Sequence, residues 1–370
     1  MFADAVGAVP MSPAVLNAYW GALAEGWADP RRQYKEADRA RAMLDDAREE
    51  LASHIGSSPA HTHFAPTPAV SAERIVLGIA AARRGRLRAI ASAAESASML
   101  AAARHVSGEG FIEIPVDREA RLDLDEFSRA VAGHDIAFAA VQHANGEVGT
   151  LQPLEDAHAA ALVAKVPLVV DATSTIGWLT PPTAWDALIA NPANWGGPSG
   201  LGILALRPGL RWLPAWPNGA PWAPGSVNIP AAIAATTALR FREAERSESL
   251  LQTVALAQAL RVAIAAIPDS IILGHPRAHL PHVVTANFVY CDAGKVAALL
   301  DSVGIAVGAG CSCGGDPLSP CPTLVAMGSM VHGTVRFGLS PGLDHEDIAR
   351  LTREVATAVA AVRTQAGAPR

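Results

Sequence analysis

Lysine is scarce in this chain of 370 residues, which contains only Lys35, Lys165 and Lys295, so arginine supplies most of the positive charge. The net charge is −6, and no long run of either sign occurs. A basic stripe that would bind nucleic acid is therefore absent. No apolar run is long enough to cross a bilayer, and residues 1–10 lack the charged and hydrophobic segments of a signal peptide. We expect a cytoplasmic protein that binds neither nucleic acid nor membranes.

Cysteine is also rare, yet three of the four cysteines lie close together. Cys311, Cys313 and Cys321 follow one another closely, whereas Cys291 ends an apolar segment and is expected in the core. Clustered cysteines in a cytosolic chain favour reactivity or metal binding over a structural disulfide. The three thiols therefore predict a site for an iron–sulfur cluster or zinc, although their spacing matches no standard four-ligand pattern. Three alternatives stay open: a fourth ligand from His332, Asp316 or a partner protein, a disulfide from Cys311 to Cys313 or Cys321, and plain loop cysteines.

Hydrophobic residues make up half of the sequence, which is enough for a large core and for a main domain plus a smaller one. The most informative stretch begins with the apolar run 166–170, which ends at Asp171. An apolar run followed by an acid is typical of a buried parallel strand whose carboxylate lies at the edge where α/β sheets bind ligands. A glycine-rich loop that ends in Gly-Pro-Ser-Gly at 197–200 leads into a second buried strand, 203–206.

These segments resemble the cysteine desulfurases, in the class V aminotransferase branch of the fold-type I pyridoxal phosphate (PLP) enzymes. The family shows Asp-Ala-Thr after a strand and then Gly-Pro-x-Gly, and both motifs occur here, at 171–173 and 197–200. The resemblance extends over essentially the whole chain. It implies an α/β fold of the fold-type I PLP-transferase kind, with a large domain of mostly parallel sheet at 12–232. A small α+β domain would combine 1–11 with 233–370, and the protein would be a homodimer with its site at the interface.

The resemblance also implies roles for individual residues. Asp171 takes the place of the aspartate that holds the pyridine nitrogen protonated, and Asn145 falls in the matching His-x-Asn segment. Arg336 takes the place of the arginine that grips the substrate carboxylate. Cys311 takes the sulfur-accepting position, where a thiolate attacks the substrate sulfur. Ser226 keeps a hydroxyl in a loop that reaches into the neighbouring subunit's site.

The chain departs from the family at the residue that matters most for PLP chemistry. Counting back from Gly197, the place of the Schiff-base lysine falls on Asn194, and an amide cannot form a Schiff base. Four further positions differ from the family pattern. The stacking histidine is Ser96, the ring-oxygen asparagine is Gly146, the arginine of the inter-subunit loop is Ala223, and the phosphate loop 65–71 carries two prolines, which lack an N–H.

These changes lead us to expect a degenerate desulfurase homologue that does not bind PLP covalently. It would act in sulfur transfer or as a pairing or scaffold subunit through Cys311, with a sulfur acceptor or scaffold protein as partner. A second reading is new chemistry in the old pocket, with Cys311 as nucleophile and Asp171 or Glu147 as polar anchor. A third is noncovalent PLP binding with slow transamination or desulfuration. The residues that match the family pattern also have plain structural explanations. Asp171 would cap a turn, and Arg336 would pair with a carboxylate inside the fold.

Overall fold

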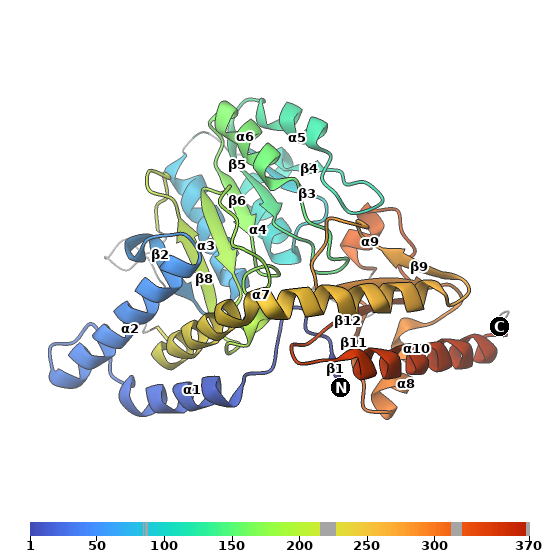
Figure 1. Ribbon diagram of the computed structural model, residues 1–370. Coiled ribbons are helices and arrows are strands. Elements are labelled where there is room, and N and C mark those ends of the chain that lie inside the picture. Colours follow the sequence, from blue (N-terminus) through green and yellow to red (C-terminus); the bar gives the residue numbers. More distant parts are fainter. Residues whose placement is uncertain (84, 86–87, 215–226, 312–319, 368–370) are drawn as a thin grey trace.

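The computed structural model describes residues 1–370 except 84, 86–87, 215–226, 312–319 and 368–370. The described residues form a seven-stranded sheet and a five-stranded sheet. The long helix α7 (Ile229–Ala265) runs from the first sheet to the second (Figure 1). The predicted α/β architecture with a mostly parallel main sheet is confirmed, because four of the six strand pairings in the larger sheet are parallel.

The larger sheet has the strand order β2-β8-β7-β6-β5-β3-β4. All seven residues of β5 are buried, as expected for a strand covered on both faces. The strands are β2 (Thr62–Ala65), β3 (Arg88–Ser92), β4 (Ile112–Ile114), β5 (Ile136–Gln142), β6 (Leu168–Asp171), β7 (Ala187–Ala190) and β8 (Gly202–Leu206).

Helices cover both faces of this sheet. Phe138 and Ala140 of β5 join a core cluster with α3 and α4, while Ala139 and Val141 join another with α2, α5, α6 and the first half of α7. This alternation follows from the two-residue period of a strand. The helices and 3₁₀ turns of this part are α1 (Pro13–Glu25), α2 (Lys35–His54), η1 (Pro59–His61), α3 (Pro68–Ala82), α4 (Ala97–Ser107), η2 (Gly108–Gly110), α5 (Leu124–Val131), α6 (Leu154–Ala164) and η3 (Pro192–Trp195).

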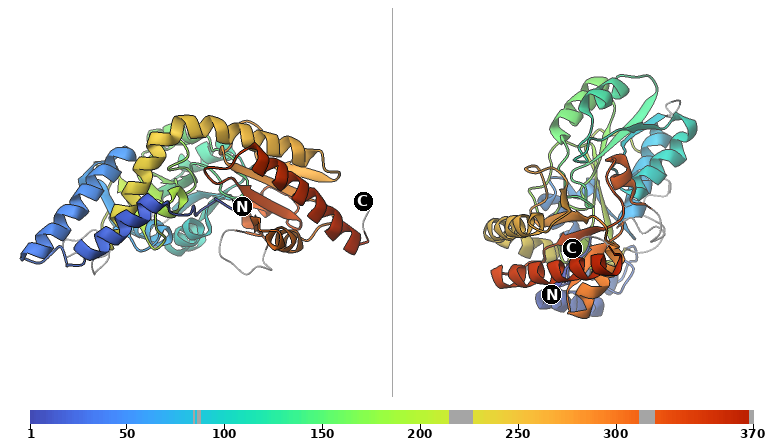
Figure 2. Two further views of the ribbon diagram at one scale, coloured as in Figure 1. Left: turned by 60° about the horizontal axis from the view of Figure 1, so that its bottom comes forward. Right: turned by 90° about the vertical axis from the view of Figure 1, so that its right-hand side faces the viewer.

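The smaller sheet has the order β1-β11-β12-β10-β9, and the N-terminal strand pairs with β11. Its core cluster contains side chains from α8, α10 and the second half of α7, and Figure 2 shows α7 and α10 lying side by side over it. The elements are β1 (Phe2–Ala3), β9 (Ser270–Leu273), β10 (Val283–Phe288), α8 (Ala293–Ser302), β11 (Ala306–Ala309), α9 (Pro322–Ala326), β12 (Thr334–Gly338) and α10 (His345–Gln365).

Helix α7 crosses from one core to the other without interruption. The predicted domain boundary at residue 232 therefore falls within its first turns, since the helix begins at Ile229. Helix α1 begins after Ser12, whose side chain accepts a hydrogen bond from the N–H of Val15. Among the described residues, no helix combines the length and apolarity needed to span a membrane.

Candidate functional site

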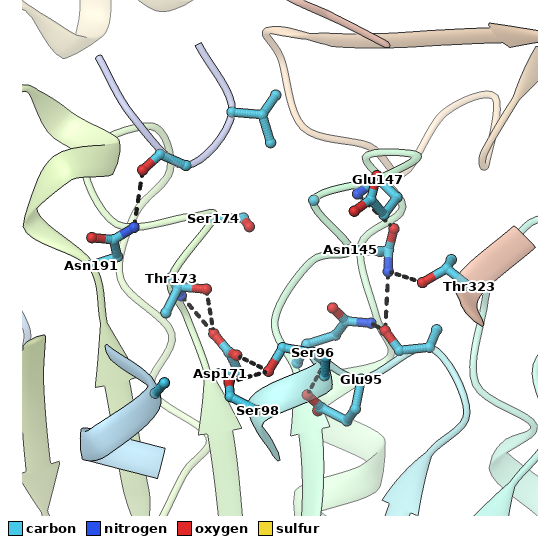
Figure 3. Close-up of a pocket in the computed structure, with 17 residues that line it drawn as sticks. Glu95, Ser96, Ser98, Asn145, Glu147, Asp171, Thr173, Ser174, Asn191 and Thr323 are labelled. Carbon is cyan, nitrogen blue, oxygen red and sulfur yellow. Dashed lines mark hydrogen bonds between the residues drawn. The ribbon is translucent and has the colours of Figure 1, made fainter. Parts of the chain in front are cut away.

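A cavity of about 530 Å³ lies where the parallel strands of the larger sheet end. Its walls come from the segments that follow β3, β5, β6 and β7, together with Val6, Gly7, Ala69 and Thr323 (Figure 3). The winding of the sheet reverses at β3, because β4 pairs on one side of it and β5 on the other. Ligands of open α/β sheets bind in the crevice at such a point, and the volume suits a small molecule.

Asp171 is the last residue of β6 and is buried at the floor of this cavity. Its Oδ2 accepts a hydrogen bond of 2.8 Å from the Ser96 hydroxyl. Its Oδ1 accepts two bonds from Thr173, one from the backbone N–H at 2.9 Å and one from the hydroxyl at 2.6 Å. The structure thus brings the predicted residues Asp171 and Ser96 together. The Thr173 bonds also make Asp171 a turn cap, so the structural explanation of this carboxylate holds at the same time.

Glu95 is a second acid of the cavity wall, and the sequence analysis did not predict a role for it. Its side chain is buried beside Asp171, and one carboxylate oxygen accepts a bond of 3.0 Å from the Ser96 N–H. The other oxygen, Oε1, is buried without a hydrogen-bond partner. Burial and the nearby Asp171 raise the pKa of Glu95 well above its usual value. The cavity therefore holds one acid whose pKa is raised beside one that accepts three hydrogen bonds.

Asn145 shapes the turn that follows β5. Its side-chain oxygen accepts bonds from the N–H groups of Glu147 and Val148, at 2.9 and 3.0 Å. Its Nδ2 donates to the carbonyl of Ala94 and to the Thr323 hydroxyl. Every one of these bonds is internal to the fold. Asn145 lines the cavity, and its carboxamide fixes where the Glu147 side chain begins.

Asn194 lies beside the cavity wall and is fully buried. Its side-chain oxygen accepts a bond of 3.3 Å from the N–H of Gly7, and its Nδ2 donates to the carbonyl of Ile176 at 3.2 Å. Asn191, three residues earlier, lines the cavity instead and donates to the carbonyl of Gly7 at 3.0 Å. The two amides hold the N-terminal segment against η3, and a direct contact of Asn194 with a coenzyme stays a prediction.

Arg336 lies on β12 and is engaged by two carboxylates of the protein. Its Nη1 donates to Glu147 Oε2 at 2.6 Å, and its Nη2 is 3.3 Å from Asp4 Oδ1. The side chain of Arg336 is 7% exposed and that of Glu147 is 10% exposed. Gly308 permits this approach, because a Cβ there would meet both Asp4 Oδ1 and Arg336 Nη2 within 2.9 Å. Arg336, predicted to bind the substrate carboxylate, thus forms ion pairs with carboxylates of the protein itself.

The cysteines open onto a different cavity from that of Asp171. Cys311 and Cys321 line a space of about 440 Å³ together with Asp292 and His332, on the far side of Glu147. Cys311 is in a disulfide bond, whereas Cys321 and Cys291 are free thiols, so a Cys311–Cys321 disulfide is wrong. Cys291 lies in the core of the smaller sheet, as predicted. The predicted site residues Ser226 and Cys313, and the alternative ligand Asp316, lie outside the described residues.

Comparison with known folds identifies the architecture as that of the fold-type I PLP enzymes. A solved NifS-like protein superimposes with a TM-score of 0.88 over 97% of this chain and 99% of its own, at 23% identity. The apo structure of a cysteine desulfurase from Thermococcus onnurineus gives a TM-score of 0.87 over 98% of this chain and 95% of its own, at 21% identity. At these identities the likeness concerns the fold alone.

The family follows from the sequence match. The model of the class-V aminotransferase family matches residues 1–351, and the chain belongs to that family. It is 28% identical over 361 residues to the cysteine desulfurase IscS 1 of Archaeoglobus fulgidus, which covers 94% of each chain. It is 29% identical over 357 residues to the cysteine desulfurase NifS of Azotobacter vinelandii, covering 92% of this chain and 87% of that protein. The resemblance to cysteine desulfurases is confirmed.

Proposed function

We propose that this protein is a cysteine desulfurase homologue that forms no covalent imine with PLP and acts in sulfur transfer, or as a pairing or scaffold subunit, through Cys311. One observation carries the proposal: no lysine lines the cavity. Lys35, Lys165 and Lys295 are all exposed, and none of them is among the residues of the cavity wall. The amide that stands in the place of the lysine, Asn194, has no nucleophilic nitrogen.

The phosphate end of the cavity offers PLP a poor fit as well. Ala69, in the first turn of α3, lies in the wall. A helix N-terminus binds phosphate through unsatisfied N–H groups, but Pro68 has none, and the N–H of Val70 already donates to the Thr67 hydroxyl at 3.2 Å. Few donors of this turn therefore point at a ligand. The residues present do not fit a covalently held PLP, and we derive no reaction step through it.

Sulfur transfer requires only a thiol that accepts and donates a sulfur atom. Once its disulfide is reduced, the Cys311 thiolate can attack the outer sulfur of a small persulfide, which forms the Cys311 persulfide and releases the donor thiolate. An acceptor thiolate can then take the sulfur from Cys311 in the same way. Cys311 lines an open cavity, so donor and acceptor have a path to it.

An iron–sulfur cluster on Cys311, Cys313 and Cys321 is another form of the same proposal. It would make the protein a carrier of a cluster rather than of single sulfur atoms. Iron and labile sulfide in protein purified without oxygen, lost in Cys311→Ser, would support this form.

Noncovalent PLP binding is the competing candidate, and Asp171 favours it. A carboxylate at the end of β6 that keeps accepting hydrogen bonds is suited to hold a protonated ring nitrogen. An active desulfurase or aminotransferase of this kind would need no lysine side chain for binding. Its mark would be an absorbance band of PLP that survives dialysis without a covalent bond.

A homodimer is also part of the proposal. Trp20 in α1 and Trp27 just after it are 66% and 67% exposed, and Leu23 between them is 41% exposed. Large aromatic side chains at such exposure are typical of a surface that a partner covers. The retained Gly-Ser-x-Asn-x-Pro segment at 225–230 agrees with a second copy.

The test combines desulfuration with sulfur loading. Reduced protein supplied with cysteine and PLP is expected to form no alanine or sulfide above a protein-free control. The same protein treated with glutathione persulfide should gain one sulfur atom on the peptide that contains Cys311, Cys311→Ser should lose this gain, and the matched variant Cys291→Ser should keep it. Catalytic formation of alanine that Cys311→Ser abolishes would refute the proposal.

A further inference from the structure

Three potential metal ligands converge between the two cavities. The carboxylate of Glu147, the sulfur of Cys311 and the sulfur of Cys321 all lie within 4.8 Å of one another. They come from three parts of the chain: the turn after β5, the segment that follows β11, and the residue that precedes α9. Two thiols and one carboxylate form a donor set that suits a borderline-soft divalent cation such as Zn²⁺ rather than Mg²⁺ or Ca²⁺.

The spacing of these atoms is close to what zinc needs. Bonds of about 2.0–2.3 Å at the tetrahedral angle place ligand atoms roughly 3.3–3.8 Å apart, and Glu147 Oε1 is already 3.7 Å from Cys311 Sγ. Two ligands are held by the fold. The backbone of Glu147 is fixed by Asn145 and by the Thr285 hydroxyl, which donates to its carbonyl at 2.6 Å. Cys321 is 5% exposed in a small apolar cluster.

The charges around the three ligands also favour a divalent cation. Two thiolates and a carboxylate carry three negative charges, which a divalent cation would leave at one negative charge. Arg336 adds a positive charge next to the site, because its Nη1 lies 2.6 Å from the other oxygen of Glu147, and it shares that charge with Asp4. Glu147 therefore offers Oε2 to the guanidinium and Oε1 to the side of the sulfurs.

A cation also has a way in. The cavity of about 440 Å³ reaches both sulfurs, with Asp292 and His332 in its wall. The disulfide at Cys311 determines whether this sulfur can act as a ligand. A disulfide sulfur is a poor metal ligand, and only the thiolate binds strongly. Reduction by an added phosphine, which becomes the phosphine oxide, gives thiols, and each ligating thiol releases its proton when the cation binds.

We propose that the reduced protein binds one Zn²⁺ per chain through Glu147, Cys311 and Cys321, with a fourth position left open toward the cavity, and that the Cys311 disulfide prevents this binding. Three protein ligands with one open position are the pattern of zinc sites that accept an exogenous ligand. The site does not require PLP, so the test of zinc binding does not depend on whether the protein binds PLP.

The experiment titrates Zn²⁺ into phosphine-reduced protein against a chromophoric chelator and repeats the titration with Co²⁺. Reduced protein should bind one Zn²⁺ per chain and show the thiolate-to-cobalt charge-transfer band, and oxidised protein should do neither. Cys321→Ser is expected to weaken binding by more than about 100-fold, and Glu147→Gln by about 10–100-fold. Cys291→Ser, which alters a buried thiol of the other core, should bind as the unchanged protein does.

A measurement without any variant covers the case in which the variants fold poorly. In the unchanged reduced protein, Zn²⁺ should protect Cys321 and Cys311, but not Cys291, from alkylation under partly denaturing conditions. Equal alkylation of Cys321 with and without Zn²⁺ would overturn the site. So would unchanged affinity in folded Cys321→Ser, or the binding of iron with labile sulfide in place of a single cation.

Discussion

At the scale of single residues, Asn194 is held by a hydrogen-bond pattern that a lysine cannot reproduce. Its carboxamide accepts from the N–H of Gly7 and donates to the carbonyl of Ile176, in a fully buried position. An ammonium group only donates. The packing has therefore adapted around the amide, and the loss of the lysine reaches into the N-terminal segment that lines the cavity.

Asn194→Lys is accordingly expected to lower the free energy of unfolding by more than about 2 kcal/mol, because it buries a charge and leaves the Gly7 N–H without an acceptor. Urea unfolding measures this loss. The comparison variant is Asn191→Lys, whose longer side chain starts from the cavity wall and still donates toward the carbonyl of Gly7, although it loses the bond of 3.2 Å that Asn191 accepts from the N–H of Ala193. It should cost less. A stable Asn194→Lys protein that regains desulfuration would contradict this explanation.

Arg336 gives a second residue-scale prediction. Arg336→Gln leaves Glu147 buried without its cation and should destabilise the fold by about 3–5 kcal/mol. Asp4→Asn, which removes the longer and more exposed contact of 3.3 Å, should cost less than about 1 kcal/mol. Thermal or urea unfolding of the two variants compares them directly. Equal and small losses would mean that the guanidinium does not hold Glu147, and would favour a role for Arg336 toward an external carboxylate.

At the scale of elements, the start of β8 is built against the start of α3. A Cβ on Gly202 would overlap the backbone of Thr67 and Pro68, so only glycine allows the two elements to approach this closely. This glycine, two residues after the Gly-Pro-Ser-Gly motif at 197–200, thus has a packing reason apart from any ligand. Of these two elements, the helix contributes Ala69 to the wall of the cavity.

Gly202→Ala should therefore destabilise the protein by about 1–3 kcal/mol through overpacking. The matched control is Gly21→Ala in the exposed interior of α1, where a Cβ meets nothing within 4 Å. That substitution should stabilise the helix by roughly 0.5–1 kcal/mol, because alanine loses less backbone entropy than glycine. Opposite signs in urea unfolding are the expected result, and a neutral Gly202→Ala would show that β8 and α3 can separate.

Much of the element pattern could be predicted from sequence. The apolar run 166–170 with Asp171 contains β6, and the predicted strand 203–206 matches β8 to within one residue. What could not be predicted is the pairing of side chains from distant elements. Glu95 follows Ala94 in a motif that gave no sign of its buried carboxylate, and the approach of Cys321 to Glu147 depends on how α9 packs against the turn after β5.

At the scale of the whole molecule, several histidines are withdrawn from water: His63 and His282 are buried, and His143 is partly buried. Desolvation lowers the pKa of His63 and of His143 from 6.5 to about 4, and lowers that of His282 well below its usual value. His143 contacts the Thr175 hydroxyl at 3.0 Å, and His282 stacks on Trp178. These groups are spread over both sheets, so protonation acts on the entire fold.

Stability is therefore expected to fall as the pH drops from 6.5 toward about 4, because the unfolded chain then takes up protons that the folded chain refuses. Glu95 has the opposite effect, since its raised pKa removes stability as the pH rises above 4.5. Urea midpoints across this range measure the sum. His143→Gln should weaken the acid loss, and the exposed His134→Gln should not. Identical pH profiles for both variants would contradict the burial argument.

That no side chain of this protein forms an imine with PLP in the cavity is tested most directly by borohydride reduction. The protein is incubated with PLP, dialysed, reduced and digested, and every lysine peptide and the N-terminal peptide are weighed by mass spectrometry. We predict no pyridoxyl group beyond the low level that exposed amines also acquire in the urea-unfolded chain. One pyridoxyl group per chain on a single peptide of the folded protein, absent after unfolding, would contradict the claim.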